Sequence, residues 1–181
     1  MLLIEVPMTS EGWDELKQEF IAPEIKVLQL EHSLISLSKW ESKWCKPFFS
    51  RQAKTEEEIL DYIKCMTLTS NVKPEVYNKL SAQNFDQIDK YINAPMTATT
   101  FYEDEKTKSN RETITSELIY YWMITLNIPV EFQKWHINKL LTLIRVCNIK
   151  NAPPKKRSAR EIMSQNAALN AARRKQLNTK G

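Results

Sequence analysis

The chain has 181 residues, of which 42% are hydrophobic and 27% are charged, values typical of one globular domain or of one domain with an appendage. Only two glycines are present, Gly12 and Gly181, which excludes phosphate-binding glycine loops, dinucleotide fingerprints and Gly-x-Ser-x-Gly nucleophile turns. The scarcity of glycine also favours an α-rich fold over a β-sandwich or barrel, whose tight turns use this residue.

The N-terminal segment predicts two strands separated by a helix. Residues 2–6 form a short apolar run that Pro7 ends, and the β-like residues of 24–30 predict a second strand that pairs with it in a small sheet. Between them, Ser10 resembles a helix N-cap, and Pro23 ends that element. The apolar residues spaced for one face of this helix are Trp13, Leu16 and Phe20.

Local start signals predict a series of helices through the middle of the chain. Ser38 and Thr55 each open a capping box, in which a serine or threonine is followed three residues later by glutamate. Proline at a first turn and further cap residues mark the other starts. The predicted starts are Ser38, Thr55, Pro74, Ser81, and Thr113 or Thr115.

The segment between these helices and the C-terminal region predicts a strand, a loop and a long helix. Residues 96–101 are rich in threonine, which favours a third strand, and the polar residues 102–111 predict a surface loop. Pro129 starts the longest helix, from Val130 to about Cys147. Its broad apolar face includes His136, so we expect a hydrogen-bonded core histidine.

The last 30 residues differ in character from the rest. Residues 151–157 contain two adjacent prolines and no apolar period, which predicts a stiff linker. A third capping box at Ser158 starts a basic amphipathic helix within an arm at 158–181. The sequence therefore predicts a mainly α protein: a compact helical body at 1–150 with a small N-terminal sheet, the linker, and the C-terminal arm.

The net charge of +4 is distributed unevenly along the chain. From Lys150 onward there are nine basic residues and one acidic residue, Glu161, so this part carries +8 and the preceding part −4. The nine basic residues are Lys150, Lys155, Lys156, Arg157, Arg160, Arg173, Arg174, Lys175 and Lys180. A mildly acidic body thus precedes a strongly cationic arm, and such an arm is typical of an interaction segment.

The arm has three interpretations: a docking helix in an apolar groove of a protein, an arm on nucleic-acid phosphates, or a merely solvated tail. It lacks the interleaved aromatics that stack on bases, which disfavours nucleic acid. Trp40 and Trp44, one turn apart, are either core residues or an interface hot spot. The candidate partner-binding residues are Lys155, Lys156, Arg157, Arg160, Ile162, Leu169, Arg173, Arg174, Trp40 and Trp44.

Residue types that carry chemistry are few. The two histidines, His32 and His136, form no zinc-binding spacing with each other or with cysteine. The three cysteines are widely spaced in apolar patterns, which predicts reduced, buried thiols. The two runs of acidic residues do not indicate an ion site, because helix capping explains residues 56–58 and solvation of a loop explains residues 103–105. The sequence therefore predicts no catalytic residue, no metal site and no cofactor.

No window of the sequence approaches a membrane span, and the N-terminus lacks the basic and apolar regions of a secretion signal. We therefore expect a cytosolic protein without membrane contact.

Two stretches resemble small proteins encoded among the tail genes of siphophages and prophages, the tail assembly chaperones. These stretches are residues 31–44 (EHSLISLSKWESKW) and 135–147 (WHINKLLTLIRVC). The short run 66–69 (MTLT) and the closing PPKK of 153–156, followed by an Ala/Arg-rich helix, fit the same pattern.

This resemblance implies a non-enzymatic protein in the cytoplasm of an infected bacterium. Proteins of that kind bind tape-measure and tail-tube subunits during assembly and are absent from the finished virion; self-association is a further option. The alternative is a structural neck, connector or tail component whose arm docks on a neighbouring subunit. The resemblance specifies no binding residues.

Overall fold

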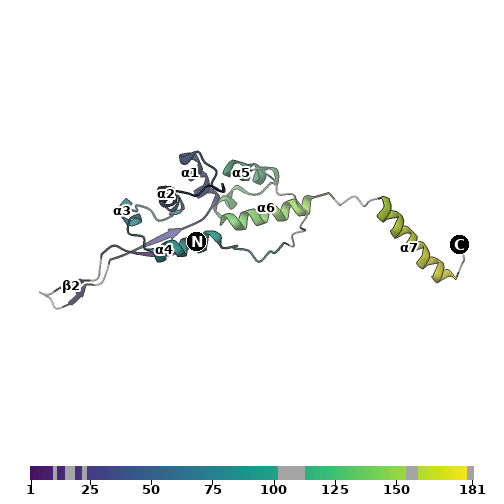
Figure 1. Cartoon of the computed structure of the whole chain (residues 1–181), viewed down its shortest axis with the longest axis horizontal. Helices are drawn as coiled ribbons and strands as arrows, with labels where there is room; N and C mark the ends of the chain where they lie inside the picture. The colour runs from purple at the N-terminus through teal and green to yellow at the C-terminus, as the bar shows by residue number, and fades with distance from the viewer. Residues whose placement is uncertain (10–11, 15–18, 22–23, 102–112, 154–158, 179–181) are drawn as a thin grey trace. The chain divides into compact units, whose positions relative to one another are not determined.

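The computed structural model describes residues 1–9, 12–14, 19–21, 24–101, 113–153 and 159–178 (Figure 1). The chain divides into two compact units, Met1–Asn148 and Ile149–Gly181. It is mainly helical and has a small antiparallel N-terminal sheet, which confirms the predicted fold class.

The described elements follow one another with the strands first. The strands are β1 (Leu2–Pro7), β2 (Gly12–Asp14), β3 (Glu19–Ile21) and β4 (Ile25–Leu30). The helices are α1 (Leu34–Trp44), α2 (Glu56–Met66), α3 (Pro74–Tyr77), α4 (Ala82–Asn93), α5 (Ser116–Thr125), the 3₁₀ helix η1 (Val130–Lys134), α6 (Ile137–Asn151) and α7 (Ala159–Leu177).

Strands β1 and β4 pair antiparallel, as predicted, with Ile4 opposite Leu28. Side chains alternate between the two faces, so Ile4 and Leu28 are buried in the core while Leu3 and Val27 are exposed. Helix α4 packs against β1. The inner face of this two-stranded ribbon is therefore one wall of the core.

The helix predicted between the two strands is wrong where the structure describes it. Residues 12–14 and 19–21 are strands β2 and β3, paired antiparallel with Trp13 opposite Phe20. The seven-residue separation of Trp13 and Phe20 fits a helix face, but it also fits two positions opposite each other across a hairpin. The cap at Ser10, Leu16 and the end at Pro23 lie outside the described residues.

Helix α1 begins five residues before the predicted start, because Ser33 rather than Ser38 is its N-cap. The Ser33 hydroxyl accepts a hydrogen bond from the Ser36 amide at 3.3 Å. The glutamate of the expected capping box, Glu41, is instead buried. Its carboxylate accepts the amides of Phe48 and Ser116, each at 2.7 Å. Glu41 thus joins α1 to the loop that follows it and to the first residue of α5.

Four further local start signals are confirmed, while the capping box predicted at Ser158 lies outside the described residues. Thr55 and Glu58 form the predicted capping box, and Ser81 caps α4 in a reciprocal pair with Asn84. Pro74 is the first residue of α3, and Thr115 is the N-cap of α5.

The strand predicted at 96–101 is wrong, since this segment has no strand structure and pairs with neither described sheet. Met96 has a φ of 50°, which is incompatible with the extended backbone of a ladder. The predicted loop that follows, 102–111, lies outside the described residues.

The long helix predicted from Val130 is divided into η1 and α6 by an extended residue, Trp135. The division arises because this backbone makes contacts with the start of α1: His136 forms an antiparallel bridge with Ser33, and the Ile137 amide donates to the His32 carbonyl at 2.8 Å. The C-terminal part of the expected apolar face is confirmed, since Leu140 and Ile144 are buried.

Replacement of Glu41 tests its role in joining these segments. We expect Glu41→Gln to lower the free energy of unfolding by about 1–3 kcal/mol, because an amide exchanges one acceptor oxygen for a donor that faces a buried N–H. Urea denaturation measures the change. The matched control is Glu57→Gln at an exposed position of α2; equal stability of the two variants would contradict the assignment.

Candidate partner-binding surfaces

Helix α7 presents the candidate residues of the arm that the structure describes. Every side chain described in it is exposed, including Arg160, Arg173 and Arg174. Leu169 keeps 51% of its surface exposed. Lys155, Lys156 and Arg157 lie outside the described residues, and so does the side chain of Ile162.

Spacing along α7 brings apolar and basic side chains to one face. Leu169, Arg173 and Leu177 follow one another at intervals of four residues, so they form one row along the helix. Arg174 and Lys175 lie in the last turn, where positive charge interacts favourably with the helix dipole. The row combines two exposed leucines with a cation, as expected of a helix that docks against a protein surface.

The two candidate tryptophans differ in their surroundings. Trp40 is only 1% exposed, and its indole N–H donates to the Glu58 carbonyl at 2.8 Å. Its candidate role at an interface is therefore wrong, because the face of α1 that carries Trp40 packs on α2. Trp44 is half-buried and donates to the Asp61 carboxylate at 3.0 Å, so part of its ring remains at the surface.

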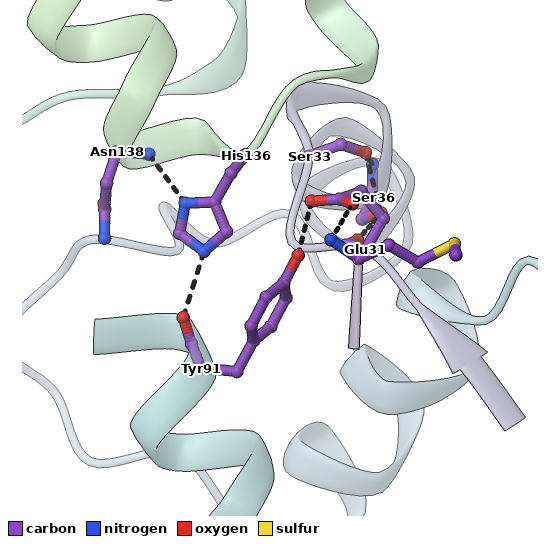
Figure 2. Close-up of polar contacts among 7 residues, drawn as sticks. Glu31, Ser33, Ser36, Tyr91, His136 and Asn138 are labelled. Atoms are coloured by element: carbon purple, nitrogen blue, oxygen red, sulfur yellow. Dashed lines mark hydrogen bonds and ion pairs between the residues drawn. The ribbon is translucent and has the colours of Figure 1, made fainter. Parts of the chain in front are cut away.

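A polar cluster joins the start of α1, the end of α4 and the start of α6 (Figure 2). The Tyr91 hydroxyl donates to the Glu31 carboxylate at 2.7 Å, and Glu31 also pairs with the Met1 ammonium at 2.8 Å. The Tyr91 carbonyl accepts from Nε2 of His136 at 3.0 Å. Nδ1 of the same ring accepts the Asn138 amide at 3.3 Å, so both ring nitrogens have partners in the neutral tautomer that carries its proton on Nε2.

The remaining residues of this cluster fix the backbone. The Ser36 hydroxyl donates to the Glu31 carbonyl at 2.9 Å, while the Asn138 side chain donates to the carbonyls of Ile92 and Ala94. Because these hydroxyls and amides satisfy buried or terminal backbone groups, the cluster positions three segments of the chain. Only part of this cluster could be predicted: His136 falls on an apolar helix face, whereas Glu31 and Tyr91 belong to no motif.

The other histidine, His32, lies beside His136. The rings of His32 and His136 are 5.0 Å apart, and Nδ1 of His32 is 2.5 Å from the Tyr62 hydroxyl. Burial, together with the neighbouring His136, lowers the pKa of His32 to about 3. Burial also lowers the pKa of His136. Both rings are therefore neutral at pH 7, and the predicted core role of His136 is confirmed.

The cysteines differ from the prediction in one case. Cys45 is exposed because it ends α1 in a left-handed conformation with a φ of 50°, beyond the buried face of the helix. Cys65 and Cys147 are partly buried, and burial raises the pKa of the Cys65 thiol. Among the residues that the structure describes, no three His, Cys, Asp or Glu side chains gather in a way that could hold a metal ion.

Comparisons with known proteins give no relative: no family model, no curated protein and no solved structure matches this chain. Within the described ranges, no helix has both the length and the apolar character needed to cross a membrane.

The buried histidines make stability depend on pH. The unfolded state binds protons below the ordinary histidine pKa of about 6.5, whereas folded His32 does so only near 3. The stabilisation is therefore complete above about pH 6.5 and is lost as the pH falls toward 3. Between pH 7 and pH 5 we expect the free energy of unfolding to fall by about 2 kcal/mol from His32.

Urea denaturation at these two pH values measures this dependence. His32→Gln keeps an acceptor for Tyr62 but cannot titrate, so its stability should change less over this interval, with the remaining dependence assigned by His136→Gln. The same pH dependence in wild type and in both variants would contradict the assignment.

Removal of residues 152–181 tests whether the arm is independent of the body. The buried apolar core consists of residues from Ile4 to Ile144, all within the first unit. We therefore expect a melting temperature within about 2 °C of that of the full chain, measured by circular dichroism. A fall of more than about 5 °C would show that the last helix contributes to the core.

Proposed function

We propose that this protein is a non-enzymatic tail assembly chaperone of a bacteriophage. It binds the tail-tube protein, the tape-measure protein or both in the cytoplasm of the infected host, before the virion is complete. The resemblance of residues 31–44 and 135–147 to tail assembly chaperones supports the class of protein. The observation that carries the binding function is the exposed cationic helix α7, which belongs to a unit separate from the body.

Helix α7 has few contacts that stabilise it within its own unit. It is 19 residues long and its described side chains are all exposed, so it gains no stability there from burying an apolar face. In proteins most of the stability of a helix comes from packing of an apolar face rather than from its helix propensity. A partner that covers Leu169 and Leu177 and that offers carboxylates to Arg173 and Arg174 would supply the missing burial and charge compensation.

Co-expression with siphophage tail-tube and tape-measure proteins, taken from the genes that flank the gene for this chain, tests the proposal; flanking genes of another kind would contradict it. The full chain should raise the soluble yield of at least one of them and co-purify with it. We expect Arg173→Glu combined with Arg174→Glu to reduce co-purification at least about tenfold, because the reversed charges repel an acidic surface. The matched control is Lys39→Glu with Lys73→Glu, the same charge change at exposed positions of the body.

Other outcomes identify the alternatives. Mass spectrometry that detects the chain at stoichiometric copy number in purified mature particles would contradict the chaperone function and favour a neck, connector or tail component. Steeply salt-dependent affinity for DNA or RNA, lost in the Arg173→Glu/Arg174→Glu variant and unaccompanied by tail-protein binding, would show a nucleic-acid arm instead.

A further inference from the structure

The body contains a cavity of about 750 Å³ that no feature discussed so far explains. It lies between α2, α4 and the loop that joins α1 to α2. Its volume falls within the roughly 300–1,000 Å³ of ligand pockets. Aromatic and aliphatic side chains from all three segments line it, among them Phe48, Phe49, Ile59, Phe85 and Ile92.

The apolar wall of this pocket is elongated. Phe85, Ile88 and Ile92 of α4 all line it and are spaced by three and four residues, so they form one stripe over two helical turns, about 10 Å long. Across the pocket, Ile59 of α2 remains 40% exposed. A stripe of this length matches the apolar face of a second helix, whose anchoring side chains recur at the same spacing.

The pocket also holds a cation, Lys54, that forms no ion pair with a described carboxylate, although Glu58 interacts with it at longer range and Asp89 also lines the pocket. Lys54 is half-buried, and its ammonium lies 4.2 Å from the centre of the Phe48 ring and donates to the Phe48 carbonyl at 2.8 Å. Burial lowers the pKa of Lys54. Among the described residues no carboxylate lies within ion-pair distance of it, whereas the nearby Lys43 and Lys46 pair with Asp61 and Glu58.

We propose that this pocket binds a helical segment of a partner protein that inserts apolar side chains along α4 and places an aspartate or glutamate against Lys54. The apolar stripe specifies the spacing of the anchors, and the Lys54 ammonium, which has no ion pair among the described residues, specifies the charge beside them. This inference rests on the proposed protein-binding function and names the chemistry of the partner.

Two synthetic peptides test the pairing with Lys54. Both are helices of about 16 residues with leucines at positions i, i+3 and i+7; one carries glutamate beside this row and the other glutamine. Fluorescence anisotropy measures binding to the full chain. We expect the glutamate peptide to bind about five to ten times more tightly, because only its side chain carries a negative charge that pairs with the ammonium.

Substitutions in the protein assign this preference to the pocket. Lys54→Gln should bind the two peptides equally. The matched control is Lys139→Gln, since Lys139 also lies over an aromatic ring, at 4.1 Å from Trp135, but does not line this pocket. This control should keep the preference. Ala53→Trp adds bulk at an exposed lining position and should weaken both peptides at least about tenfold.

Equal affinity of the two peptides for the wild-type chain, or unchanged binding to Ala53→Trp, would overturn the proposal. Binding of decanoate without binding of either peptide would also overturn it and would show a site for small amphipathic carboxylates. The peptides contain no tail-protein sequence, so these results are independent of the co-expression test. If the peptides bind as expected but no tail protein co-purifies, the pocket remains a helix-binding site and the assignment to phage tail assembly is contradicted.

Discussion

The body depends on the contact between the start of α1 and the start of α6. There the Ile137 amide donates to the His32 carbonyl, and His136 forms a backbone bridge with Ser33. This contact ends the preceding 3₁₀ helix and places two neutral histidine rings side by side. It also orients the His136 ring, which accepts from the Asn138 amide and donates to the Tyr91 carbonyl. Because His32 and Asn138 also line the pocket, the same contact fixes part of its wall. Loss of the neutral histidines would therefore weaken the core and deform the pocket together.

The sequence predicts the helices whose start depends on neighbours in the chain. Thr55 and Ser81 form their caps with residues three positions away, so a local pattern contains the whole interaction. Two of the predictions that failed, the start of α1 and the undivided helix from Val130, depend on residues outside the local pattern. Glu41 fits a local box with Ser38 but is used by the amides of Phe48 and Ser116, and the extended Trp135 depends on contacts with α1. A single sequence does not show which of two satisfactory partners a side chain takes.

The two candidate binding surfaces differ in the same way: one could be predicted from a continuous segment of sequence, and the other could not. The helix of the cationic arm could be predicted because charge and helix pattern are properties of one continuous segment, and α7 lies within the predicted arm; Ser158, the predicted cap, lies outside the described residues. The pocket could not, since Lys54 has the pattern of an ordinary surface lysine and gains its significance from Phe48 and the stripe on α4. Trp40 and Trp44 look equivalent in sequence, and only packing on α2 separates a core residue from a surface one.

The net charge of the body is a poor guide to what it binds. Although residues before Lys150 carry −4, the Glu58 and Asp61 carboxylates near the pocket are already paired with Lys46 and Lys43, whereas Lys54 has no such partner. The cation that a ligand meets beside Phe48 is therefore Lys54, while Asp89, an exposed residue of α4, lines another part of the pocket. Both surfaces combine apolar side chains with a cation, so both select for an amphipathic acidic partner. Such a partner would bind more weakly as salt screens the exposed arm, while the half-buried Lys54 would be screened less. The salt dependence of binding would thus separate the contribution of the arm from that of the pocket.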